Sequence, residues 1–317
     1  MALTGVAALA VGLISATLAP AQAVACTTSS LGVPSCGALW GVTVAGQSTS
    51  ALDTLQTQIG RRFNLVYDFH SIGDRVPTAA ESAEVAAGQA LHINLQAGGY
   101  SYAQIAAGAA DKGLVGQAAG VASLHKPVFV TFEHEPDAKP NLVKGSGAQF
   151  VAAWRHIYAL FRAHGATNAV WVWVVTGWKG NFGQYKALWP GNSYVDWISW
   201  DPYGGVNCAP NPVLTGTFAS VTAPMYDWIK TTGPSVGIDP TKPEMLSEYA
   251  VEYSPSQPSA QGQWLAGIPS ALAADFPRVK ALAYWDVTGG NCRYLLTTSH
   301  TTLTDFAQAG HAGYVNP

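Results

Sequence analysis

Residues 128–175 read VFVTFEHEPDAKPNLVKGSGAQFVAAWRHIYALFRAHGATNAVWVWVV, and this stretch contains the pattern that decides the fold. It begins with the apolar run 128–132 and ends with the apolar run 169–175, and a segment with helical periodicity lies between them at 147–165. Both runs are apolar on both faces, which is typical of parallel strands that are covered on each side. The stretch therefore predicts a strand–helix–strand unit of a parallel α/β protein.

The same alternation continues along the chain. Strands are expected at 39–44, 64–69, 91–96, 128–132, 169–175, 194–200, 244–247 and 281–285, and helices near 50–60, 78–90, 102–123, 147–165, 182–188, 215–232, 259–275 and 302–309. Eight such units predict a single-domain (β/α)8 TIM barrel. The alternative, an open doubly wound sheet, carries a Gly-rich turn after its first strand, and 41–46 (GVTVAG) does not fit that turn.

The first 25 residues resemble an export signal. An apolar run at 6–18 precedes Ala-Pro-Ala-Gln-Ala at 19–23, although 1–5 carry no Lys or Arg. We therefore expect a signal peptide at 1–25, a secreted protein, and a catalytic barrel domain at 26–317. A second Ala-x-Ala before Cys26 leaves lipid anchoring at that cysteine as an alternative.

The four cysteines are expected to form disulfides, because an exported chain meets an oxidising compartment. Cys26 and Cys36 would close a short N-terminal loop, and Cys208 and Cys292 would join two distant loops. No pair has the C-x-x-C spacing of a metal or redox site.

Composition excludes several classes of partner. Charged residues are 11% of the 317 residues and the net charge is −3, which does not suggest nucleic-acid binding. Beyond the leader no segment is long and apolar enough to span a membrane. We expect the protein to be a monomer.

Polar residues gather where the expected strands end. They are Asp68 and His70 after the second strand, Glu133-His134-Glu135 after the fourth, Asp201-Pro202-Tyr203 after the sixth, Glu248 after the seventh, and Trp285-Asp286 at the eighth. A TIM barrel has its active site at this end of its strands. Glycoside hydrolysis needs two carboxyl groups that face each other across the scissile bond, and Glu135 and Glu248 lie on nearly opposed strands.

Three motifs resemble glycoside hydrolase family 26, the β-mannanase family of retaining glycosidases. They are 132–137 (FEHEPD), 195–203 (VDWISWDPY) and 242–249 (KPEMLSEY). By position, the resemblance implies Glu135 as acid/base, Glu248 as nucleophile, His134 and Tyr203 as their partners, and Trp285 as the floor of the adjacent sugar subsite. The family's Arg four residues ahead of the acid/base is Thr131 here, and its Met-Asn-Gly and the following Trp are missing after the His-Glu pair.

Some site residues remain open at this stage. Strand alternation puts Glu133 and Glu135 on one face, so only the resemblance favours Glu135. We expect His70 and Trp178 to contact sugar as well, with a barrel-rim hydrogen bond or a core position as the alternatives. No cofactor and no metal are expected, because His134-Glu135 lacks the H-E-x-x-H spacing of a zinc helix.

The sequence thus predicts a retaining endo-β-glycanase that acts on a polysaccharide, with β-1,4-mannan as the favoured substrate. Mixed-linkage β-glucan and xylan are the alternatives, and a catalytically silent carbohydrate-binding barrel is a rival of another class. A serine hydrolase is disfavoured because its G-x-S-x-G nucleophile elbow lies between a strand and a helix. The match at 233–237 (GPSVG) instead follows the expected helix 215–232.

Overall fold

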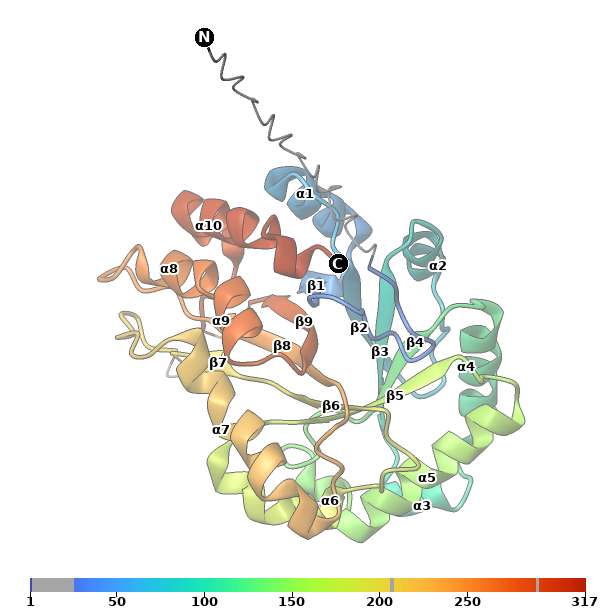
Figure 1. The fold of residues 1–317 in the computed structure, drawn as a ribbon. Coiled ribbons are helices and arrows are strands. Elements are labelled where there is room, and N and C mark those ends of the chain that lie inside the picture. The colour runs from blue at the N-terminus through green and yellow to red at the C-terminus, as the bar shows by residue number, and fades with distance from the viewer. Residues whose placement is uncertain (2–25, 206–207, 289–290) are drawn as a thin grey trace.

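The computed structural model describes Met1 and residues 26–205, 208–288 and 291–317 (Figure 1). All paired strands run parallel: β1 (Leu39–Val44), β2 (Leu65–Ser71), β3 (Ala90–Gln96), β4 (Val128–Phe132), β5 (Ala169–Val175), β6 (Trp197–Trp200), β7 (Tyr203–Gly204), β8 (Glu244–Val251) and β9 (Val279–Asp286). Strand β6 also pairs with β8, so the sheet closes. The two-residue β7 extends the line of β6 along β8, and the other eight strands form the barrel. The predicted (β/α)8 fold is confirmed.

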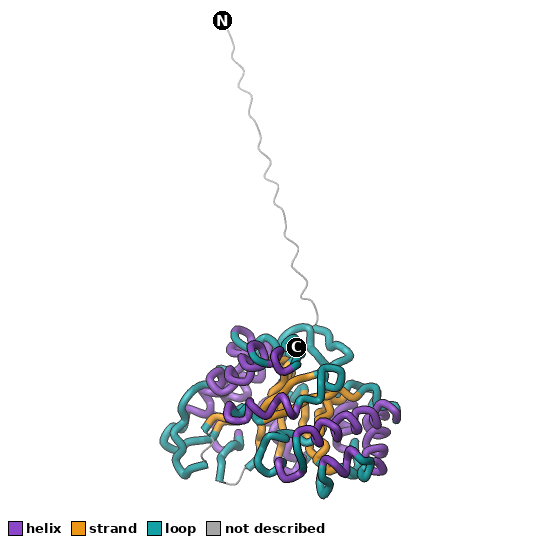
Figure 2. The backbone as a smooth tube through the Cα atoms, turned by 90° about the horizontal axis from the view of Figure 1, so that it is seen from below, coloured by secondary structure: helices purple, strands orange, loops and turns teal. Residues whose placement is uncertain are grey.

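Helices surround the strands (Figures 1 and 2). They are α1 (Thr49–Ile59), α2 (Ala79–Ala86), α3 (Tyr102–Ala106), α4 (Asp111–Ser123), α5 (Gly147–Ala163), α6 (Tyr185–Leu188), α7 (Phe218–Thr231), α8 (Ala260–Ala266), α9 (Ile268–Ala274) and α10 (His300–Gly310). Two expected helices are each divided. The segment 102–123 breaks where Gly108 adopts φ 86°, and 259–275 breaks before Pro269, which has no N–H to continue the helix.

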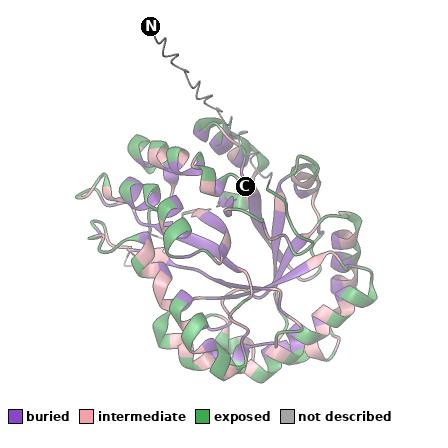
Figure 3. Cartoon of the chain, in the orientation of Figure 1, coloured by how far each residue is buried: buried purple, intermediate pink, exposed green. Residues whose placement is uncertain are grey.

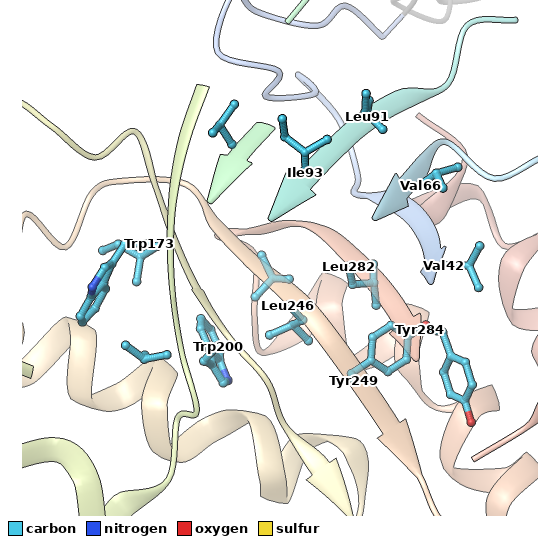
Figure 4. Packing of buried hydrophobic residues seen from close by; sticks show 14 of the residues in the cluster. Val42, Val66, Leu91, Ile93, Trp173, Trp200, Leu246, Tyr249, Leu282 and Tyr284 are labelled. Carbon is cyan, nitrogen blue, oxygen red and sulfur yellow. The ribbon is translucent and has the colours of Figure 1, made fainter. Parts of the chain in front are cut away.

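Two apolar layers hold the barrel together. One lies inside it and contains Leu65, Phe129, Val172, Trp197 and Met245 among others. The other lies between strands and helices, and Figure 4 shows part of it. Figure 3 shows the strands buried and the outer helix faces exposed. Burial on both sides explains why the strands read as continuous apolar runs.

The N-terminal loop closes the amino end of the barrel. A disulfide joins Cys26 to Cys36, with their Cα atoms 5.7 Å apart. The carbonyl of Leu31 accepts a 2.7 Å hydrogen bond from the indole of Trp197, and Val33 packs against the inner core. Residues 2–25 of the leader expected at 1–25 lie outside the described residues. None of the described helices has the length and hydropathy needed to cross a membrane.

Candidate active site

Glu248 faces the barrel interior because β8 contains one extra residue at that point. Leu246 and Tyr249 are three positions apart, whereas their partners on β9 are two positions apart. Both side chains belong to the outer core, so Ser247 and Glu248 between them are turned inward. The bulge therefore brings a carboxyl group to the carboxyl end of the barrel.

Glu248 is 6% exposed and has two polar neighbours at its side chain and one at its backbone. The hydroxyl of Tyr203 donates a 2.6 Å hydrogen bond to Oε2, and Nε2 of His134 lies 3.9 Å from Oε1. The backbone N–H of Glu248 donates to Oδ1 of Asp201 at 2.9 Å. The two motifs at 195–203 and 242–249 thus meet in space.

The ring of His134 has a defined orientation. Its Nδ1 lies 2.8 Å from the amide nitrogen of Asn94, whose oxygen accepts the backbone N–H of His134 at 3.0 Å. The Asn94 amide therefore donates to Nδ1, and burial lowers the pKa of His134 to about 4, with a smaller contribution from Lys144. The neutral ring then carries its proton on Nε2, which points toward Glu248.

The prediction that Glu133 and Glu135 share a strand face is wrong, because β4 ends at Phe132. Both glutamates instead adopt positive φ, 49° and 50°. The carboxylate of Glu133 is held by the N–H of Ala97 at 2.6 Å and by Lys144 at 3.0 Å. Glu133 is thus engaged in fixing the loop.

Glu135 lines a cleft of about 460 Å³. Its backbone N–H donates to the carbonyl of Val174 at 3.1 Å, which ties the end of β4 to β5. Asp201 and Tyr203, the neighbours of Glu248, also line this cleft. The structure therefore brings Glu135, Glu248, His134 and Tyr203 to one site.

The electrostatics distinguish the two candidate glutamates. Burial, followed by the charges of Glu248 and Asp137, raises the pKa of Glu135 to about 8. Burial raises the pKa of Glu248 to about 7, while the Tyr203 hydrogen bond lowers it. Burial and both glutamates also raise the pKa of Asp201 well above its ordinary value. The hydrogen bond from Tyr203 stabilises the charged form of Glu248, whereas burial and the charge of Glu248 favour the protonated form of Glu135.

An aromatic group borders the site. The ring of Phe69 lies 5.1 Å from that of His134 and 5.6 Å from that of Trp285, both edge to face. Trp285 is half-buried at the end of β9. A flat, partly exposed ring that packs on Phe69, itself in contact with His134, is suited to contact the face of a sugar.

The structure does not bring His70 to this site. Inward-facing Leu65, Tyr67 and Phe69 alternate with His70 on β2. The His70 ring instead lies 2.5 Å from Glu81 of α2 and is 5% exposed. His70 therefore fastens α2 to the outside of the barrel.

Trp178 lies on the loop after β5, 66% exposed, and lines the same cleft as Glu135. The second disulfide, between Cys208 and Cys292, connects the loops that follow β7 and β9. Tyr294, two residues beyond Cys292, packs 5.3 Å from the ring of Tyr203. This disulfide therefore braces the segment behind the tyrosine that contacts Glu248.

Sequence reasoning did not assign Phe69, Asn94 or Asp201 to the site. The alternation on β3, where buried polar His92 and Asn94 occupy every second position, was the available signal for Asn94. Phe69 lies two positions after Tyr67 on β2, so strand alternation was the available signal for Phe69 as well. For Asp201, the Asp-Pro-Tyr at a strand end was noted without a role for the aspartate.

Comparison with solved structures finds proteins of known activity with the same fold. No family model matches the chain. The catalytic domain of a family 26 endo-β-1,4-mannanase from Bacillus sp. JAMB-750 is 16% identical, with a TM-score of 0.64 over 88% of this chain and 86% of that one. The Bacteroides ovatus family 26 β-mannanase is 14% identical, with a TM-score of 0.62 over 89% and 90%.

The chain has the fold of the family 26 β-mannanases. Endoglucanase H of Acetivibrio thermocellus is 26% identical over 280 residues, which are 85% of this chain. The chain spans about 30% of the length of that relative. The similarity to these structures is thus one of fold, over 88–89% of this chain.

Proposed function

We propose that this chain is a retaining endo-β-glycanase of the family 26 type, with Glu248 as nucleophile and Glu135 as acid/base. The observation that carries the proposal is the pair of unequal carboxyl groups at the carboxyl end of the barrel. Tyr203 favours the ionised form of Glu248, and burial favours the protonated form of Glu135. Retaining hydrolysis needs this division of roles.

The reaction proceeds in two displacements. The Glu248 carboxylate attacks the anomeric carbon, the glycosidic C–O bond breaks, and Glu135 gives its proton to the leaving oxygen. Glu135, now a carboxylate, takes a proton from water, whose oxygen attacks the anomeric carbon and releases Glu248. His134, with its proton on Nε2, and Tyr203 orient Glu248, and Trp285 supports the sugar.

The favoured substrate is β-1,4-mannan, because the family 26 structures that share the fold are described as mannanases. Mixed-linkage β-glucan is the second candidate, favoured by the sequence similarity to an endoglucanase. Thr131 stands where a family Arg is expected, and its hydroxyl binds His92 and the Val172 carbonyl within the barrel. That family sugar contact is therefore not reproduced.

Secretion belongs to the proposal as well. Both disulfides lie within the described residues, and disulfides persist in extracellular compartments. The N-terminal signal sequence expected at 1–25 agrees with this compartment.

The test is hydrolysis of mannan, lichenan, xylan and cellulose by the protein and its Glu248→Ala, Glu135→Ala and Glu133→Gln variants. We expect one polymer to be cleaved, with a loss of at least about 100-fold in the first two variants. Glu133→Gln should retain activity, because that carboxylate faces Ala97 and Lys144. The first product, followed by NMR, should keep the β configuration. Polymer binding without cleavage would instead favour the silent carbohydrate-binding barrel.

A further inference from the structure

A second aromatic surface lies on the acid/base side of the candidate site. Trp178 lines the 460 Å³ cleft together with Glu135, whereas Trp285 lies with Phe69 at the end of β9. At 66% exposure, Trp178 is the most exposed aromatic side chain of the described residues. A large apolar ring left in water beside a cleft indicates a binding role.

The turn that carries Trp178 is fixed to the acid/base segment. Asp137, two residues after Glu135 and 2% exposed, accepts the N–H of Thr176 at 3.1 Å and the amide of Asn181 at 2.8 Å. It also accepts the hydroxyl of Thr176. The backbone N–H of Trp178 in turn donates to that hydroxyl at 3.2 Å. The position of the tryptophan is therefore set relative to Glu135.

The indole itself rests on Gly180. A Cβ at this position would lie 2.5 Å from Nε1 and 2.9 Å from Cδ1 of Trp178, so the ring occupies the space that a side chain would fill. Ser220, Val221 and Pro224 of α7 line the same cleft. The cleft lining thus combines a flat aromatic ring with a mainly apolar part of a helix.

Resting on the proposed function, we infer that Trp178 is the stacking platform for the leaving-group sugar, the residue that Glu135 protonates. An acid/base must reach the glycosidic oxygen, so the leaving sugar lies on its side of the scissile bond. The Trp that follows the His-Glu pair in the family is missing here, and Asp137 from the same segment instead anchors a tryptophan on the β5 loop. The glycone occupies the other side, near Trp285.

The test compares substrates with and without a leaving sugar. Mannohexaose and cellohexaose fill both sides of the scissile bond, whereas β-mannobiosyl and β-cellobiosyl fluoride release only fluoride. Trp178→Ala should lower kcat/KM for the cleaved hexaose about three- to tenfold and leave that for the matching fluoride within about twofold. Gly180→Ala should show the same selective loss by displacing the ring, and Trp178→Phe should restore most of it.

Leu31→Ala is the control, since this exposed apolar side chain belongs to the loop at the amino end of the barrel. It should leave both substrates unaffected. Equal losses on hexaose and fluoride, or no loss on either, would overturn the assignment of Trp178 while the two-glutamate mechanism stands. If the unaltered protein cleaves no polymer of the panel, neither hexaose and neither fluoride, the proposed function itself fails.

Discussion

Removing the hydroxyl of Tyr203 should narrow the pH range in which the protein is active. In Tyr203→Phe, Glu248 loses a buried 2.6 Å hydrogen bond that stabilises its charged form. A hydrogen bond to a charged group contributes about 1.5–3 kcal/mol. At 1.36 kcal/mol per pKa unit, the pKa of Glu248 should rise by about one to two units.

The rise in the pKa of Glu248 moves one limb of the pH profile. The nucleophile must be ionised, so kcat/KM rises as pH passes upward through the pKa of Glu248; this acidic limb should move to higher pH in Tyr203→Phe. The basic limb reports the loss of the proton from Glu135. The profile therefore narrows from its acidic side and its maximum falls, because fewer molecules combine an ionised Glu248 with a protonated Glu135.

The assay is kcat/KM from pH 4 to 10 on the polymer that the protein cleaves. Tyr249→Phe is the matched control: Tyr249 follows Glu248 on β8, but its buried hydroxyl has no hydrogen-bond partner among the described residues. Its profile should match that of the unaltered protein. An acidic limb that does not move in Tyr203→Phe would refute the role of this hydrogen bond.

Two further predictions concern stability. Asp137→Ala leaves the donors of Thr176 and Asn181 without their acceptor and should lower the free energy of unfolding by about 2 kcal/mol in urea titration. The control, Asp53→Ala at an exposed position, should change the free energy of unfolding by less than about 0.5 kcal/mol. Equal effects of the two substitutions would contradict the anchoring role of Asp137. Replacing both Cys208 and Cys292 by Ser should cost about 2 kcal/mol more than the same change at Cys26 and Cys36, because the sequence separations are 84 and 10. If the Cys26/Cys36 variant instead had the lower urea midpoint of unfolding, loop closure would not be the cause of the difference in stability.

The sequence contains enough information for the barrel and for the position of its carboxyl groups. Strands buried on both faces produce unbroken apolar runs such as 128–132, and the helices between them show one apolar stripe. Boundaries were less accurate: β8 continues past the expected 247 to Val251, and β6 begins at Trp197 instead of 194. Polar Glu248 interrupts the apolar run of β8, although pairing to β9 continues.

Side-chain direction was harder to predict than position. The rule of alternation failed at Glu133, where the strand had ended, and at Glu248, where a bulge adds a residue. His70 stands at a strand end like the site residues, but its partner Glu81 comes from a helix on the outside. Such facts depend on contacts between distant segments, which local pattern does not encode.

The N-terminal loop that closes the amino end of the barrel also determines where a fused module, a tag or a solid support can be attached. Cys26 and Pro317 line one cavity there, together with the start of β4, so the described chain enters and leaves at the face opposite the loops that carry Glu135 and Trp178. A fused module, an affinity tag or a solid support joined at either point would hold the barrel by its base. The cleft would then face away from the attached group and stay open to an insoluble polymer.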